Sequence, residues 1–439
     1  MMANINTQNE NNTSSIIPMI IIGLLFFIFG FVTWLNGSLI PFLKIICDLN
    51  DFQALFVTFA FYIAYTVMAL PMASVLERTG YKNGIALGLI IMVIGTLLFI
   101  PAALSANYLF FLIGLFILGT GLTILQTASN PYVVFIGPTE SAAMRISIMG
   151  IINKTAGVLV PLIFTAIILS DLGDTSETAL QMLSEPEIQA LSERLIQPYM
   201  YMAVVLLFLI GLVHFSRLPS IEMEDKTQHE ETEKTNILEF PQVILGSVAI
   251  FAYMGVEVMA GDTIGLFGSN LGVPNFAALT SYTMVFMVLG YLIGVLFIPK
   301  YISQRQALLG SAIAGGLCIL GIVFSSVNSS SMASLLWGWS AIPIVPNPIF
   351  FVALMGMAHA LVWPAIWPLS LTGLGRLSAK GSALLIMGIA GGAILPLVFG
   401  KLSQIFDSLQ AAYWMGIPCY LVILFYALKG HKMRNWSDF

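Results

Sequence analysis

The feature that most constrains this chain is its series of long apolar segments. A helix needs about 20 apolar residues to cross the hydrocarbon core of a bilayer, and only helices or closed barrels satisfy their backbone polar groups there. Charged residues make up 9% of the 439 residues, far below the roughly 25% of soluble domains. The sequence predicts an all-α polytopic membrane protein with twelve transmembrane helices, near residues 18–42, 52–75, 84–104, 108–135, 143–169, 199–216, 242–266, 276–299, 307–326, 347–372, 381–402 and 410–429.

The basic residues predict how these spans are oriented, because Lys and Arg are enriched in cytoplasmic loops. With the N-terminus inside, only Lys44, Arg194 and Lys401 fall outside, and Lys154 falls within a span. The first segment is predicted to stay in the mature protein, because it follows a polar leader rather than a basic one. Both termini are therefore predicted to be cytoplasmic, together with Arg78, Lys82, Arg145, Arg217, Lys226, Lys234, Lys300, Arg305, Arg376, Lys380, Lys429, Lys432 and Arg434.

A charged connection divides the spans into two sets of six. It contains IEMEDKTQHEETEKTN and shows no apolar periodicity. IMGIINKTAGVLVPLIF from Ile148 and IMGIAGGAILPLVFG from Ile386 resemble each other at equivalent places in the two sets. Parallel six-span repeats with a binding site between them are typical of major facilitator transporters. The predicted domains are a cytoplasmic tail 1–17, a six-helix bundle 18–216, a cytoplasmic linker 217–241, a second six-helix bundle 242–430 and a cytoplasmic tail 431–439.

Two acidic residues stand in the seventh apolar segment, FAYMGVEVMAGDTIGLFG. Glu257 and Asp262 would each cost at least about 2.5–3.5 kcal/mol at bilayer depth, so a bound cation, a basic partner or a water path must compensate them. Lys154 of the fifth span is a candidate partner of either acid, as a coupling pair or as a structural ion pair. Thr263 adds a hydroxyl. The two acids lie about 140° apart on an ideal helix and share a face only if the helix unwinds at Gly261.

Several segments together resemble the fucose/glucose/galactose permease family of the major facilitator superfamily. They are FFIFGFVTWLNGSLIPFLK, FQALFVTFAFYIAYTVMALPM, LQTASNPYVVFIGP, RISIMGIINKTAG and GVEVMAGDTIG. The details are more similar to the bacterial glucose/galactose transporters than to the fucose permease. Where the fucose permease has an Asp in span one and a Glu in span four, this chain has Gly37 and Gln126, so that proton chemistry does not carry over to these positions. The resemblance implies a location in the plasma (bacterial inner) membrane.

Amides in spans one, four and five are the first group of candidate sugar ligands. They are Asn36, Gln126, Asn130 and Asn153. An amide offers donors and acceptors that suit the paired hydroxyls of a neutral sugar, and hydrogen bonding between helices is the alternative interpretation. Asn130 precedes a proline, so it is also a candidate helix cap.

Aromatic rings are the second group. Trp363 and Trp367 are four residues apart and share a face of the tenth span, where indole rings could stack on a pyranose. Interfacial or packing roles are the alternatives, and Trp34 of span one is a further candidate. His359 is a candidate proton relay or a packed core residue.

Two polar connections have predicted structural roles. The segment 170–198 predicts an amphipathic surface helix capped by Ser176 or Ser184. The loop ASVLERTGYKNG is a degenerate form of the superfamily's loop signature, and the resemblance implies that Glu77 and Arg78 latch the two halves. Ordinary interfacial charges are the alternative for this pair.

The predicted function is cation-coupled symport of a hexose such as glucose or galactose by alternating access. Na⁺ is favoured over H⁺ because oxygen ligands cluster on span seven, with Asp262 and Glu257 as its possible ligands. A proton-coupled exporter of another metabolite or drug is the alternative. The sequence has no nucleotide-binding loop or nucleophile motif, so an enzyme is not expected. No cofactor and no nucleic-acid partner are expected, and the protein is predicted to be a monomer in the bilayer.

Overall fold

The computed structural model describes residues 3–135, 142–168, 183–215, 236–298, 300–374 and 377–438. In these ranges the chain is helical, and twelve helices are long and apolar enough to cross a membrane. The α-helices are α1 (Ala3–Ile46), α2 (Asp51–Ala54), α3 (Phe56–Leu97), α4 (Phe99–Ser105), α5 (Tyr108–Phe135), α6 (Ala142–Ile168), α8 (Glu185–Glu193), α9 (Ile196–Phe215), α10 (Pro241–Asn270), α11 (Thr280–Phe297), α12 (Gln304–Phe324), α13 (Ser331–Trp337), α14 (Asn347–His359), α15 (Val362–Leu371), α16 (Ser378–Met387), α17 (Gly391–Phe406), α18 (Leu409–Ala412) and α19 (Gly416–Leu428). Short 3₁₀ helices are η2 (Ile237–Glu239), η3 (Phe276–Ala278), η5 (Gly388–Ala390), η6 (Tyr413–Met415), η7 (Gly430–Lys432) and η8 (Trp436–Asp438).

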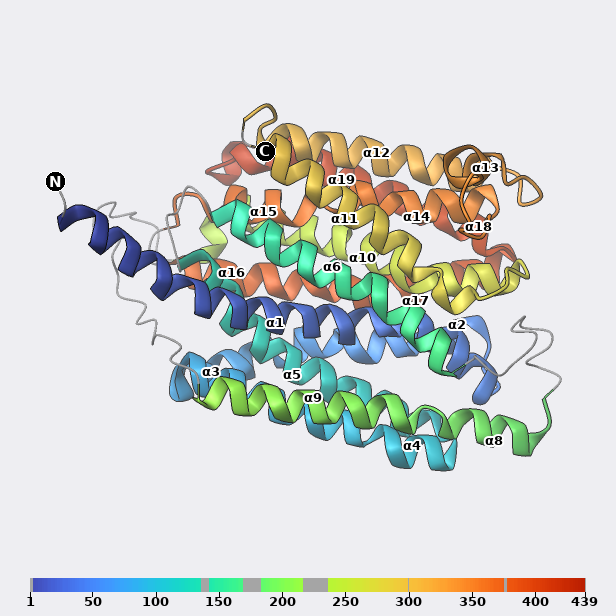
Figure 1. Ribbon diagram of the computed structural model, residues 1–439. Helices are drawn as coiled ribbons and strands as arrows, with labels where there is room; N and C mark the ends of the chain where they lie inside the picture. The colour runs from blue at the N-terminus through green and yellow to red at the C-terminus, as the bar shows by residue number, and fades with distance from the viewer. Residues whose placement is uncertain are drawn as a thin grey trace.

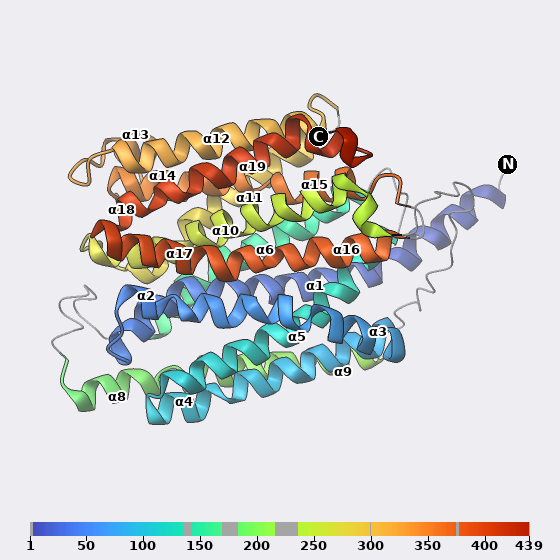
Figure 2. The same ribbon diagram turned by 180° about the vertical axis from the view of Figure 1, so that it is seen from behind.

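The long helices run side by side in a bundle, and both termini lie at the same end of it (Figure 1). Helices from the first half of the chain, blue to green, lie mostly on one side, and those from the second half, yellow to red, lie on the other (Figures 1 and 2). Between them α1, α3 and α6 pack against α10, α11 and α17. We call the end with the termini the terminal end and the opposite end the distal end.

Small residues allow neighbouring helices to approach closely. A Cβ added at Gly95 of α3 would lie 2.9 Å from the carbonyl oxygen of Gly114 in α5, and one added at Gly88 would lie 2.9 Å from that of Gly121. Close packing of this kind holds helices together in lipid, where no hydrophobic effect drives their association. The same α3 contains two spans, because Gly80 adopts φ 73°, a conformation that glycine reaches without steric cost, and redirects the chain.

The observed helices differ from the predicted spans at several ends. α1 begins at Ala3, so the predicted N-terminal tail continues the first helix, because no glycine or proline interrupts residues 3–17 and extending a helix is easier than nucleating one. The tenth predicted span consists of two helices, α14 and α15, separated at Ala360 and Leu361. The predicted surface helix is α8, and Ser184 forms its capping box with Glu187. Ser176 lies outside the described residues, as does most of the predicted linker 217–241.

Candidate functional site

Helix α10 carries both membrane-embedded acids. It is continuous from Pro241 to Asn270, so it does not unwind at Gly261, and the two acids point to different neighbours. Glu257 is 3% exposed and Asp262 is completely buried. Each acid contacts a residue from the first half of the chain, so α10 is a junction between the halves.

Glu257 is paired with Lys154 of α6. The Lys154 Nζ lies 2.7 Å from the Glu257 Oε1, and both side chains are buried. The ammonium also lies 4.1 Å from the ring centroid of Trp34 in α1, a cation–π contact. Glu257 Oε2 has no hydrogen-bond partner among the described residues. Of the two partners that the sequence allowed for Lys154, this conformation therefore uses Glu257.

Asp262 is held by a hydroxyl rather than by a charge. The Thr58 hydroxyl of α3 donates to Asp262 Oδ2 at 2.9 Å, while Oδ1 finds no partner within the described ranges. The Thr263 hydroxyl is used within the second half: it donates to the Met259 carbonyl at 2.6 Å and lies 2.8 Å from the Tyr413 hydroxyl. Glu257, Asp262 and Thr263 of α10 therefore bond to partners on three different elements, α6, α3 and η6.

The amides of the first half lie next to aromatic side chains. Trp34 Nε1 donates to Asn153 Oδ1 at 3.3 Å, and Asn153 Nδ2 donates to the Phe26 carbonyl at 3.2 Å. Asn36 is 1% exposed, and its Nδ2 is unpartnered in the part of the chain that the structure describes. The side chain of Asn130 lies outside the described residues. The structure thus groups Trp34 and Asn153 with Lys154.

Gln126 of α5 points toward α3. Its Nε2 donates to the Tyr65 hydroxyl at 3.0 Å, and Tyr65 stacks on Tyr62 with ring centroids 6.1 Å apart. The Tyr62 hydroxyl is buried without a partner among described residues. Sequence reasoning missed Thr58, Tyr62 and Tyr65. Their signal was a run of polar atoms at i, i+4 and i+7 along one face of the second span.

The predicted tryptophan pair lies beside the break between α14 and α15. Trp363 and Trp367 have ring centroids 5.5 Å apart, and Trp367 Nε1 is buried without a partner in the described ranges. His359, the last residue of α14, is completely buried and its Nε2 lies 2.7 Å from the Tyr420 hydroxyl. A helix broken at membrane depth is tolerated where it is buried in protein or lines a cavity.

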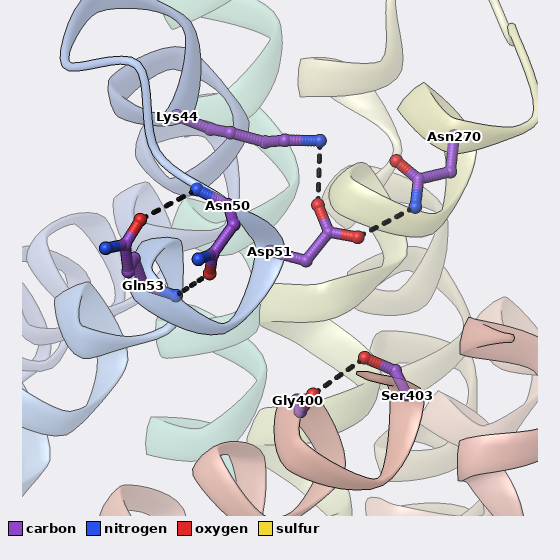
Figure 3. Close-up of polar contacts among 7 residues, drawn as sticks. All are labelled: Lys44, Asn50, Asp51, Gln53, Asn270, Gly400 and Ser403. Carbon is purple, nitrogen blue, oxygen red and sulfur yellow. Dashed lines mark hydrogen bonds and ion pairs between the residues drawn. The ribbon is translucent and has the colours of Figure 1, made fainter. Parts of the chain in front are cut away.

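The two halves also meet at the distal end (Figure 3). The carboxylate of Asp51, in α2, contacts Lys44 Nζ of α1 at 2.7 Å and accepts a hydrogen bond from Asn270 Nδ2, at the end of α10, at 3.0 Å. Closer to the membrane centre, the Ser38 hydroxyl donates to the Ala277 carbonyl at 2.6 Å. The hydrogen bonds of Asn270 with Asp51 and of Ser38 with Ala277 join the two halves at this end, and the Lys44–Asp51 ion pair lies within the first half.

The remaining predicted positions are less engaged. Arg78 is exposed on α3, and the side chain of Glu77 lies outside the described residues. The latch role of this pair stays a prediction. Across the described ranges no group of three or more His, Cys, Asp or Glu side chains could hold a metal ion.

Comparison with known proteins agrees with this architecture. The Major Facilitator Superfamily model matches residues 22–396. The chain is 32% identical over 413 residues to the glucose/galactose transporter of Brucella abortus, which covers 93% of each chain. It is 26% identical over 435 residues to the L-fucose-proton symporter of Escherichia coli, covering 94% of this chain and 93% of that one. A crystal structure of the transporter FucP in the outward conformation matches with a TM-score of 0.70 and 25% identity over 94% of this chain and 98% of that chain.

The twelve candidate spans, the superfamily match and the relatives named as transporters define a multi-pass membrane transporter rather than an enzyme. The chain belongs to the major facilitator superfamily, within its fucose/glucose/galactose permease family. The fold class and the family that the sequence predicted are therefore confirmed.

Proposed function

We propose that this chain is a secondary active sugar transporter that couples the uptake of a hexose, such as glucose or galactose, to the entry of a cation. The observation that carries the proposal is the pairing of two buried acids of α10 with partners from the other half of the chain, at 2.7 and 2.9 Å. Such contacts must break and re-form when the halves rock in alternating access. A cation that neutralises an acid changes the strength of its contact and so connects ion binding to the rocking motion.

The sugar is proposed to bind where the halves meet near the middle of the bundle. Asn36, Gln126 and Asn153 provide amides from the first half, and Trp363 and Trp367 provide rings from the second. Unpartnered buried groups, such as Asn36 Nδ2 and Trp367 Nε1, support this assignment, because a buried polar atom without a partner is costly until a ligand or water satisfies it. Asn130 and Trp34 stay predicted contacts. The name of the Brucella relative supports glucose and galactose.

Asp262 is the proposed coupling residue, and H⁺ is the proposed ion. The prediction of Na⁺ relied on oxygens clustered on span seven, but Thr263 bonds to Tyr413 and Glu257 bonds to Lys154. Among the described residues, Asp262 is left with one hydrogen-bonded hydroxyl and one carboxylate oxygen without a hydrogen-bond partner. A single free carboxylate oxygen can take a proton, whereas a hard metal ion needs several oxygen ligands. The relative named as a proton symporter supports the same choice.

The proposed orientation places the terminal end in the cytoplasm, following the distribution of basic residues. The distal contacts of Asp51 and Ser38 would then close the transporter toward the outside. The inner membrane of a bacterium is the proposed location. The domain boundaries and the monomeric state stay predictions.

Uptake by the purified protein in liposomes tests this function. We expect glucose or galactose to accumulate when an inward proton gradient is imposed, and not when the gradient is collapsed by an ionophore. A panel of hexoses, including fucose, defines the substrate. Accumulation that requires Na⁺ at constant pH would replace the proton with sodium, and transport of none of the sugars would contradict the proposal.

Gln126→Ala is expected to weaken hexose binding roughly threefold to tenfold, because one or two hydrogen bonds to sugar hydroxyls are lost. Isothermal titration calorimetry on the purified protein measures the Kd. Gln404→Ala is the control, because Gln404 is exposed on α17, and its Kd should equal that of the wild type. An unchanged Kd for Gln126→Ala would remove this residue from the site.

A further inference from the structure

Thr58 differs from the other buried threonines described in the first half of the chain in the direction of its hydroxyl. Thr96, Thr120 and Thr123 each donate to the carbonyl four residues earlier in their own helix, at 2.8–2.9 Å. This is the usual hydrogen bond by which the hydroxyl of a buried helical threonine is satisfied. The Thr58 hydroxyl instead leaves α3 and donates to Asp262 of α10. In place of the usual bond within one helix, Thr58 therefore makes a hydrogen bond that joins the two halves.

The position of this bond places it between the distal contacts and the centre of the bundle. Thr58 is seven residues from Asp51, which is about 10 Å along a helix, and both Thr58 and Asp262 are completely buried. On its other side, five residues along α10, is the ion pair of Glu257 with Lys154. A change in the charge of Asp262 therefore alters a hydrogen bond that lies next to the distal contacts between the halves.

The strength of the bond depends on the charge of Asp262. A hydroxyl that donates to an ionised carboxylate makes a bond roughly twice as strong as one to a neutral acceptor. The ionised acid therefore holds α3 against α10, and a cation on Asp262 Oδ1 weakens that hold. No other hydrogen bond to the Asp262 carboxylate is found within the described residues.

We propose that Thr58 is the positioning residue that makes closure of the distal end depend on the charge of Asp262. The inference rests on the proposed coupling role of Asp262. It adds Thr58 as the residue that connects the charge of Asp262 to the first half of the chain. Thr58 contacts neither the sugar nor the ion in this proposal. Its loss should leave sugar exchange intact and remove the dependence of rocking on the ion, so that the transporter leaks sugar down its gradient.

The test compares the accumulation of hexose with the exchange of hexose in liposomes reconstituted with the purified protein. Thr58→Val keeps the shape and removes the donor. We expect its gradient-driven accumulation ratio to fall about tenfold, in the usual range of coupling between sites, while exchange of labelled for unlabelled hexose stays within about twofold of the wild type. Thr58→Ser restores the hydroxyl and should restore accumulation. Thr123→Val is the matched control, because Thr123 is equally buried but bonds within its own helix.

Two further variants keep the outcome decisive. If Thr58→Val aggregates, Thr58→Ala removes the same donor without an added methyl group and carries the test. Combining Thr58→Val with Asp262→Asn should leave the exchange of labelled for unlabelled hexose as fast as in Asp262→Asn alone, because both substitutions remove one link. Normal accumulation by both Thr58→Val and Thr58→Ala, or failure of Thr58→Ser to restore it, would overturn the role of Thr58. If Asp262→Asn itself accumulates sugar normally, the proposed coupling role fails instead.

Discussion

Lys154→Met is expected to lower the free energy of unfolding by about 3–5 kcal/mol, the usual cost of removing one partner from a buried ion pair. The cost arises because the Glu257 carboxylate would remain 3% exposed with no cation beside it. Thermal unfolding in detergent measures the effect as a lower Tm. Lys401→Met is the control, because Lys401 is exposed on α17 and its loss should leave the Tm unchanged.

The double variant Lys154→Met with Glu257→Met separates stability from transport. Replacing both members of a buried pair with apolar residues of similar size is often neutral or stabilising, so the Tm should recover most of its loss. Sugar accumulation should be lost in the double variant, because the switchable contact between α6 and α10 has been removed. If Lys154→Met alone melts like the wild type, the pair does not stabilise the resting protein.

Asp262→Asn is expected to abolish concentrative uptake while leaving exchange. One charge moving through 100 mV supplies about 2.3 kcal/mol, equivalent to a roughly 50-fold sugar gradient. Asparagine preserves the size of the side chain and can still accept from Thr58, but it carries no charge for a cation to neutralise. We expect the accumulation ratio to fall to about one in proteoliposomes energised by an imposed gradient.

Asp407→Asn is the matched control for this substitution. Asp407 is exposed at the end of α17 with φ 49°, a left-handed conformation that asparagine also adopts. The control should therefore fold and accumulate sugar like the wild type. A substantial accumulation ratio in Asp262→Asn would assign the coupling to another residue, with Glu257 the next to test.

Much of the fold follows from apolar segment length alone. A segment of about 20 apolar residues has few alternatives to a membrane helix, so the twelve spans were predicted within a few residues at most ends. The exceptions are local. The α14–α15 break at Ala360 and Leu361 and the helical start of α1 at Ala3 depend on packing and helix propagation, which leave little trace in hydropathy.

Only part of the candidate site could be predicted from the sequence. The cost of a charge in hydrocarbon marked Lys154, Glu257 and Asp262 without any structure. Thr58 and Tyr65 were missed because a hydroxyl is cheap enough to occur in any span, and one that bonds to its own helix looks the same in sequence as one that bonds across an interface.

The sequence by itself determined that this chain has twelve membrane-spanning segments and that three charged side chains, Lys154, Glu257 and Asp262, lie within them, because burial costs act on each residue independently of its neighbours. Only the tertiary structure decided which groups meet. Lys154 pairs with Glu257, and Asp262 turns to Thr58 instead. The physical reason is that α10 stays an unbroken helix, so acids five residues apart face different neighbours, and which neighbours stand there depends on how helices more than a hundred residues apart pack together.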